Sequence, residues 1–300
     1  MPSLSDYRDR IASVKSTRKI TSAMKMVAAS KLRKAQDQAE ASQPYARSMA
    51  AMMARVAGNI SISDSSPKLL VGTGSDQKHL IVVVTADRGL CAGFNTNVVK
   101  MARLLRNKLK GEGKDVSFVC AGRKGGDLLK REAGDSIWQR FTGIIGKTRV
   151  EYADSDKVAQ FVLEKFEAGE FDICTMVYNE FESVLTQTPT TQQLIPFKMP
   201  EEQDNEEKGA VPEGPVSVYT FEPDEQEILK ALLPKNISVQ IYRAFLDSSA
   251  GEQAARMTAM DNATRNAGDM IDNLSLQYNR ARQAHITKEL IEIISGAEAI

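Results

Sequence analysis

The sequence predicts a Rossmann-like α/β domain inserted between two long helices, which pair as an antiparallel coiled coil. Residues 236–300 contain no proline and only three glycines, and their apolar side chains recur at helical spacing. Residues 3–57 lack glycine and contain one proline, Pro44. Between these segments, short β-branched runs alternate with helical stretches, a pattern typical of a doubly wound α/β domain.

Composition narrows the class of protein. The 300 residues allow one large or two modest domains, and the 42% apolar fraction is enough for a real core. A formal net charge of zero argues against a polyanion-binding protein. The sequence contains no run of 18 apolar residues, which is about the length that a membrane-spanning helix needs. Three scattered cysteines fit buried thiols better than disulfides or a zinc site.

Residues 3–57 predict a first helix of roughly 80 Å. Pro44 lacks a backbone N–H, so we expect a kink or an interruption after Gln43. Its apolar residues, among them Ile20 and Val27, follow helical spacing, but less regularly than those of the C-terminal segment. Through residue 40 the segment carries nine Lys or Arg against four Asp or Glu. Two interpretations stay open: a solvated helix face, or a basic surface for an acidic or phosphate-bearing partner.

Glycine, serine and proline mark residues 58–78 as a linker. Strands are then predicted over 80–84, 116–120 and 171–178, and helices over 98–109, 126–133 and 154–168. Such alternation implies right-handed crossovers and a parallel sheet. Further extended segments, expected to form an antiparallel edge, are 184–193 and 216–221. The acidic segment between them predicts an exposed loop.

Residues 236–300 predict a second rod of roughly 90 Å. A narrow seam of four heptads comprises Met257, Met260, Thr264, Ala267, Ile271, Leu274, Tyr278, Ala281 and His285. Its small side chains suit close packing against one particular helix. The predicted parts are therefore an N-terminal shaft helix, an inserted head and a C-terminal shaft helix, over 1–58, 76–222 and 223–300.

The sequence offers few candidate catalytic residues or motifs. The loop 87–93 follows the first strand, where doubly wound folds bind nucleotides. Its glycines do not form G-x-G-x-x-G, and the chain contains no G-x-x-x-x-G-K-[ST] motif, so a tight turn is the favoured interpretation. The only histidines are His79 and His285. We predict no catalytic site, no cofactor and no metal.

Polar residues are unusually dense near the end of the second rod, over 278–289, and the tip 293–300 is small and apolar. An apolar helix end suggests a position inside a partner. A frayed terminus is the alternative.

Four blocks carry a family resemblance. Residues 286–299, ITKELIEIISGAEA, fit I-T-x-E-x-x-[DE]-x-x-x-G-A-x-[SAKR], the signature of gamma subunits of F-type proton-translocating ATP synthases. Residues 252–264 and 10–30 resemble two more blocks of that family. Residues 87–95 resemble its D-R-G-L-C-G-G-F-N block, with Ala92 in place of a glycine. The resemblance spans the whole chain and is closest to the alphaproteobacterial and mitochondrial branch.

The resemblance implies the central rotor stalk of a motor, present in one copy per complex. Its partners would be three alpha and three beta subunits, the epsilon subunit and the c-subunit ring, with no nucleic acid. ATP would be made on alpha and beta residues, while this chain couples proton flow to synthesis by transmitting torque. Membrane association would be indirect through the c ring, on the cytoplasmic side of the inner membrane. The absence of a transit peptide favours a bacterial origin, and a processed organellar chain is the alternative that stays open.

Contact roles follow from the resemblance, position by position. Beta-subunit and coupling contacts are expected at Met24, Lys25, Arg256, Arg282, Gln283, Thr287 and Glu289, with Arg18 adding to the basic face. A foot that touches epsilon and the c ring is expected at Tyr219, Phe221 and Glu222. The chain lacks the closely spaced cysteine pair of the chloroplast type, so thiol control is not expected.

Two other function classes stay open on the residues alone. A Rossmann-like nucleotide-binding protein with a coiled-coil arm would bind nucleotide as an isolated chain. A basic coiled-coil adaptor would bind nucleic acid with a steep salt dependence.

Overall fold

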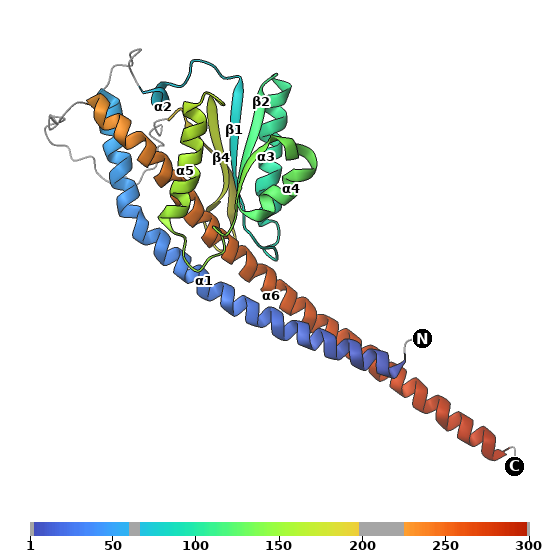
Figure 1. The fold of residues 1–300 in the computed structure, drawn as a ribbon. Coiled ribbons are helices and arrows are strands. Elements are labelled where there is room, and N and C mark those ends of the chain that lie inside the picture. Colours follow the sequence, from blue (N-terminus) through green and yellow to red (C-terminus); the bar gives the residue numbers. More distant parts are fainter. Residues whose placement is uncertain (1–2, 60–66, 198–224, 299–300) are drawn as a thin grey trace. The chain divides into compact units, whose positions relative to one another are not determined.

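The computed structural model describes residues 3–59, 67–197 and 225–298. The chain separates into two compact units. Residues 1–30 with 256–300 form what we name the helical unit, and residues 31–255 form the sheet unit. Helix α1 (Leu4–Asn59) and helix α6 (Glu225–Glu298) each contribute to both units (Figure 1). The predicted domain boundaries stay a prediction, since residues 60–66 and 198–224 lie outside the described part of the chain.

The two long helices confirm the predicted architecture, but both run through a proline. Helix α1 continues past Pro44, so the expected interruption does not occur. Helix α6 begins at Glu225, within the predicted shaft-helix segment 223–300, and includes Pro234, which precedes the predicted rod 236–300. Around these prolines, one apolar cluster joins the two helices within the sheet unit, through Met49, Met53, Leu229 and Leu233. Burial of these side chains favours the helical conformation despite the hydrogen bond that each proline removes.

A five-stranded sheet has the order β3-β2-β1-β4-β5. Its strands are β1 (Lys78–Val84), β2 (Asp115–Ala121), β3 (Ile137–Phe141), β4 (Ile173–Phe181) and β5 (Gln187–Ile195). Strands β1 to β4 are parallel and β5 is antiparallel to β4, which confirms the three predicted parallel strands and the first predicted edge segment. Sequence reasoning missed β3. The second predicted edge segment, 216–221, lies outside the described residues.

Helices cover both faces of the sheet (Figure 1). Helices α3 (Phe94–Gly111) and α4 (Arg123–Ala133) pack with the strands in one apolar cluster. Helix α5 (Tyr152–Glu167) and residues 237–255 of α6 pack in the other. The remaining helical segments are α2 (Lys68–Val71), inside the predicted linker, and a 3₁₀ turn over Gly134–Ser136. Among the described helices, none has the length and apolarity that crossing a bilayer requires.

Candidate functional site

The seam of the helical unit buries small and medium side chains. Met260, Ala267, Ile271 and Leu274 of α6 are buried, as is Ala28 of α1. Half-buried residues continue this seam from Met257 to Ala281, which confirms the predicted heptads over that range. His285 does not belong to it: its ring is exposed and its Nδ1 lies 3.3 Å from a carboxylate oxygen of Glu289. The reason is geometric: α1 begins at Leu4, and Arg8 near its start already contacts Tyr278, so this helix does not reach the turn that carries His285.

Three polar contacts join α1 to α6 across the seam. The hydroxyl groups of Thr21 and Thr264 lie 2.8 Å apart. One turn further along α1, the Lys25 ammonium lies 2.6 Å from a carboxylate oxygen of Asp261, and this hydrogen bond lowers the pKa of Asp261. Near the start of α1, the Arg8 guanidinium donates two hydrogen bonds to the Tyr278 hydroxyl, at 2.8 and 3.0 Å. Together these contacts define one antiparallel register.

The predicted beta-subunit contacts fall into two separate groups. Arg282, Gln283, Thr287 and Glu289 are exposed on the part of α6 that extends beyond the seam, which we name the overhang (residues 282–298). Within it, the Thr287 hydroxyl donates to the Gln283 carbonyl at 2.9 Å. The second group comprises the half-buried side chains of Met24, Lys25 and Arg256, with exposed Arg18 on the same helix as the first two. The predicted foot residues Tyr219, Phe221 and Glu222 lie outside the described residues.

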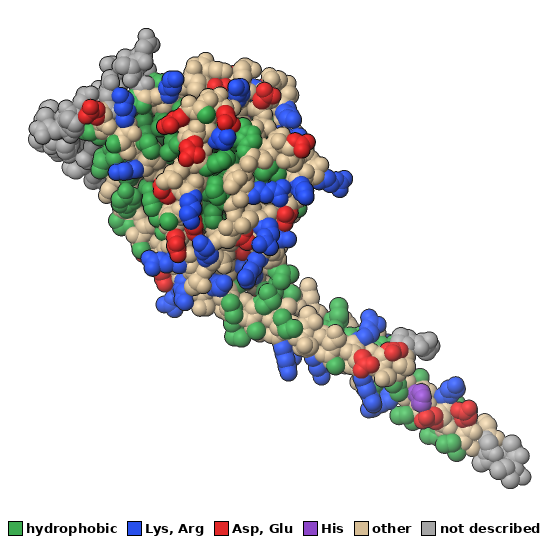
Figure 2. All heavy atoms as spheres, in the orientation of Figure 1, with side chains coloured by type: hydrophobic (Ala, Val, Ile, Leu, Met, Phe, Trp, Pro, Cys, Tyr) green, Lys and Arg blue, Asp and Glu red, His purple; other side chains and the backbone are tan. Residues whose placement is uncertain are grey.

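Large apolar side chains are also exposed in the helical unit. On the overhang they are Ile286, Leu290, Ile291, Ile293 and Ile294, which are 48–71% exposed. On α1 they are Ile20, Met26 and Val27, which are 57–65% exposed. Figure 2 shows hydrophobic and charged side chains mixed on this narrow surface. Ile20 and Val27 therefore follow helical spacing without entering the seam. Their phase differs from that of Thr21 and Ala28, which the structure buries.

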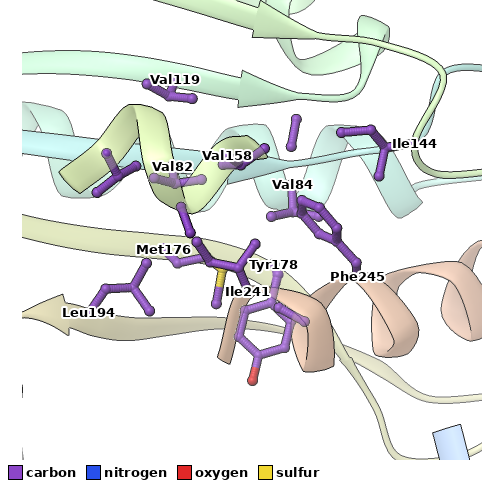
Figure 3. Close-up of a cluster of buried hydrophobic side chains, with 14 of the residues drawn as sticks. Val82, Val84, Val119, Ile144, Val158, Met176, Tyr178, Leu194, Ile241 and Phe245 are labelled. Atoms are coloured by element: carbon purple, nitrogen blue, oxygen red, sulfur yellow. The ribbon is translucent and has the colours of Figure 1, made fainter. Parts of the chain in front are cut away.

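The sheet unit has a second place of interest, the edge where its strands reverse order between β1 and β4. Ligands of doubly wound folds bind at this edge. Here α6 packs against it: Phe245 is fully buried in the same cluster as Val84 and Tyr178, at the ends of these strands (Figure 3). A Cβ atom on Gly251 of α6 would lie 3.1 Å from the Phe94 ring. The chain's own helix therefore fills this crevice.

The loop after β1 is tied to its neighbours by structural hydrogen bonds. The Asp87 carboxylate accepts from the backbone N–H groups of Arg123 and Gly143, at 2.9 and 2.8 Å. The Thr85 hydroxyl accepts from the Gly125 N–H at 2.7 Å. These bonds connect the loop after β1 to the start of α4 and to the loop after β3. This geometry agrees with the favoured interpretation of 87–93 as a tight turn.

A cavity of about 290 Å³ lies between α1, the end of β4 and α6 within the sheet unit. Glu180, Arg243 and Asp247 line it together with Arg47. Burial raises the pKa of Asp247 to about 6; the Arg243 guanidinium opposes this shift and Glu180 adds to it.

Comparison with known proteins identifies the family. The family model described as ATP synthase matches residues 3–300. The chain is 56% identical over 300 residues to the ATP synthase gamma chain of Granulibacter bethesdensis, with all of both chains covered. The chain belongs to the ATP synthase gamma-chain family. Gamma chains of Sinorhizobium medicae and Rhodospirillum rubrum are each 53% identical, again over the whole of both chains.

Chains in solved ATP synthase structures share the fold. A chain of the Euglena gracilis mitochondrial ATP synthase, solved with its c ring, aligns with a TM-score of 0.65 at 19% identity and covers 99% of this chain and 94% of its own length. A chain from the central stalk and c ring of the Tetrahymena thermophila mitochondrial enzyme aligns at 0.58 and 24% identity, covering 81% and 99%. The two long terminal helices and central mixed sheet that the sequence predicted are therefore shared with these ATP synthase chains.

Proposed function

We propose that this chain is the central rotor shaft of a proton-driven ATP synthase. Its helical unit transmits torque between a c-subunit ring and a catalytic hexamer of three alpha and three beta subunits. One copy serves each complex, and the epsilon subunit and the c ring contact its foot. The chain itself contributes no catalytic group and no cofactor. It lies at the cytoplasmic side of the inner membrane, which it reaches only through the c ring.

The observation that carries this proposal is the overhang. A helix with five exposed Ile or Leu side chains over 286–294 is costly to leave in water, because each buried aliphatic side chain contributes about 1.5–3 kcal/mol. A surrounding partner removes that cost. The polar residues Arg282, Gln283, Thr287 and Glu289 occupy the same stretch and supply directional contacts to that partner.

Torque requires that contacts with the beta subunits differ from one rotary position to the next. A partner can be shifted between conformations only by a difference in interaction free energy. The helical unit supplies such differences because its faces are unlike: one face of α1 exposes Ile20 and Val27, while neighbouring positions carry Arg18 and Lys19. A symmetric rod would offer each beta subunit the same contacts.

Affinity purification from membranes tests the rotor function. A tag in the acidic segment 201–213 should recover alpha and beta subunits at three copies each per tagged chain, with ATP hydrolysis that drives proton pumping. A chain truncated after Ala281 should still fold its sheet unit, but pumping per ATP hydrolysed should fall roughly tenfold or more because the overhang contacts are lost. Recovery of the chain alone, with tight nucleotide binding, would overturn the proposal in favour of the nucleotide-binding alternative.

The coupling role of Met24 is tested separately. Its side chain is half-buried beside the seam, so a lysine there reaches outward from the coiled coil. Met24→Lys should reduce pumping per ATP hydrolysed more than it reduces hydrolysis. Exposed Lys15→Met on the same helix serves as the matched control. Unchanged coupling in Met24→Lys would remove Met24 from the proposed coupling contacts.

A further inference from the structure

The seam of the helical unit is poor at defining how far its two helices slide along each other. Coiled coils fix their register mainly through large knobs that enter specific holes. Around its middle this seam instead presents small or slender residues, Thr21 and Ala28 on α1 and Thr264 and Ala267 on α6. Successive turns then look alike to the partner helix. Movement of one helix past another by one turn, about 5.4 Å, is a known kind of switching transition.

Polar pairs favour one register of the two helices, which the apolar side chains of the seam define poorly. Lys25 meets Asp261 at 2.6 Å, and Arg8 meets Tyr278 both through hydrogen bonds and with its guanidinium 5.5 Å from the ring centre. Both side chains of the ion pair are about half exposed, at 45% and 37%. Attraction between exposed charges stabilises a fold only modestly. Its larger effect here is to discriminate between registers.

The wrong registers are penalised by the residues one turn away. If α6 moved by four residues so that Arg265 replaced Asp261, Lys25 would face a like charge. The same movement would replace Tyr278 by Arg282, opposite Arg8, and create a second repulsion. Movement in the opposite direction would place Met257 opposite Lys25 and Leu274 opposite Arg8, so both cations would lose their partners. Like charges and unpaired polar groups are common devices against alternative pairings.

We infer that Lys25 and Asp261 are positioning residues that fix the register of the coiled coil, with Arg8–Tyr278 and Thr21–Thr264 as supporting pairs. Lys25 then acts within the chain, by holding α6 in place, and its charge is not available to an acidic partner segment. The functional consequence rests on the proposed rotor function: a shaft whose helices slip would turn at one end without moving the other in step.

Disulfide formation between paired cysteines measures the register directly in the assembled complex. Thr21→Cys with Thr264→Cys reports the observed register, since the two hydroxyl oxygens are 2.8 Å apart. Thr21→Cys with Gly268→Cys reports the register displaced by one turn. The native Cys91, Cys120 and Cys174 are buried and do not compete. With Lys25 and Asp261 intact, the first pair should cross-link and the second should not.

Charge reversal then tests the ion pair. Lys25→Glu repels Asp261 in the observed register and attracts Arg265 in the displaced one, so we expect roughly a threefold or larger rise in the 21–268 cross-link. Adding Asp261→Lys restores an attraction in the observed register while Arg265 still attracts in the displaced one, so the 21–268 cross-link should fall back toward its original level and the 21–264 cross-link should recover. Lys15→Glu is the control of equal charge change, because Lys15 is exposed and no ion pair of it occurs among the described residues. It should leave the cross-links unchanged.

Proton pumping per ATP hydrolysed, measured on the same variants without the added cysteines, separates the two proposals. Lower pumping in Lys25→Glu that is restored with Asp261→Lys supports the register role. Cross-links that do not respond to Lys25→Glu would overturn it, and a pumping defect without a change in cross-links would return the charge of Lys25 to a partner contact. A shifted register with normal pumping would support the positioning role and contradict torque transmission through this coiled coil.

Discussion

The sheet unit and the helical unit are built from the same two long helices but bury them in different ways. In the sheet unit, Phe245, Ile241 and Leu246 of α6 are almost fully buried against strands and loops. In the helical unit, the same helix buries one narrow stripe and exposes residues such as Leu290 and Ile293. The sheet unit thus stabilises itself through its own core, whereas the helical unit relies on a seam, a few polar pairs and surfaces that a partner must cover.

Truncation of a core residue should give the largest difference in unfolding free energy between the two units. Phe245→Ala removes a fully buried ring and should destabilise the sheet unit by about 4 kcal/mol. Leu290→Ala, on the same helix but 54% exposed, should change the stability of the free chain by less than about 0.5 kcal/mol. Denaturant unfolding can be followed by the fluorescence of Trp138, the single tryptophan, which lies on β3. Similar losses of unfolding free energy in both variants would contradict the difference in burial described here.

Replacing a closely packed glycine in the sheet unit should destabilise the chain nearly as much as Phe245→Ala does. Gly122 has a φ of +109°, and a Cβ atom there would lie 1.9 Å from the Thr85 carbonyl oxygen. Gly122→Ala should therefore cost about 3 kcal/mol or more, from strain and steric overlap together. Gly113 has a φ of +80° with no atom within 4 Å, so Gly113→Ala isolates the strain alone and should cost only about 1 kcal/mol. Equal costs would mean that overlap with Thr85 is relieved by movement.

Asp247 should make the stability of the sheet unit depend on pH. Its pKa is raised from 3.8 to about 6, so the folded chain retains this proton to a higher pH than the unfolded chain does. Ionisation therefore reduces stability as the pH rises from about 4 to 6, and the full cost is present above that range. Asp247→Asn should stabilise the chain by about 1–2 kcal/mol at pH 8 and have little effect at pH 4.

Thermal unfolding at both pH values measures this effect. Asp272→Asn, an exposed change on the same helix, is the control and should have no pH-dependent effect. If Asp247→Asn gave the same small change at pH 4 and pH 8, the buried carboxylate would not be titrating as described.

Amide exchange compares the two units through the free energy of local opening, and the smallest values are expected in the overhang. In the free chain, amides of the overhang should open at a cost of about 1 kcal/mol or less, because a short helix without tertiary contacts is marginal in water. Amides of β1, whose side chains from His79 to Val84 are all buried, should be among the most protected. Strong protection of the overhang in the free chain would show that it is stable without a partner.

Much of the sheet unit could be predicted because its strongest signals are local. The run from Leu80 to Val84 is apolar and β-branched, and the structure places it at the centre of the parallel sheet. Strand β3 carries no such run. It lies at the edge of the sheet, where Ile137, Trp138 and Phe141 are only half-buried and fewer apolar residues are needed. The rod predicted over 236–300 begins later than α6 does, because Pro234 resembles a helix boundary in sequence, while Leu229 and Leu233 contact distant residues on α1.

The helical unit was predictable as an architecture but not in its contacts. Heptad spacing correctly placed Met260 and Ile271 in the seam. The pairing of Lys25 with Asp261 was not visible, because it joins positions 236 residues apart and depends on the register between two helices. The same register decides that His285 is uncovered. The family resemblance supplied candidate contact residues, but which surfaces α1 and α6 leave exposed follows only from their pairing.

The overhang also has a consequence for the life of the chain before assembly. From Arg282 to Glu298 it extends about 25 Å as a single helix with uncovered aliphatic side chains. A helix end that opens readily and displays such side chains is a preferred substrate for proteases and a binding site for chaperones. Copies that do not find a partner should therefore be removed faster than assembled ones, which would keep the amount of this chain matched to the number of complexes.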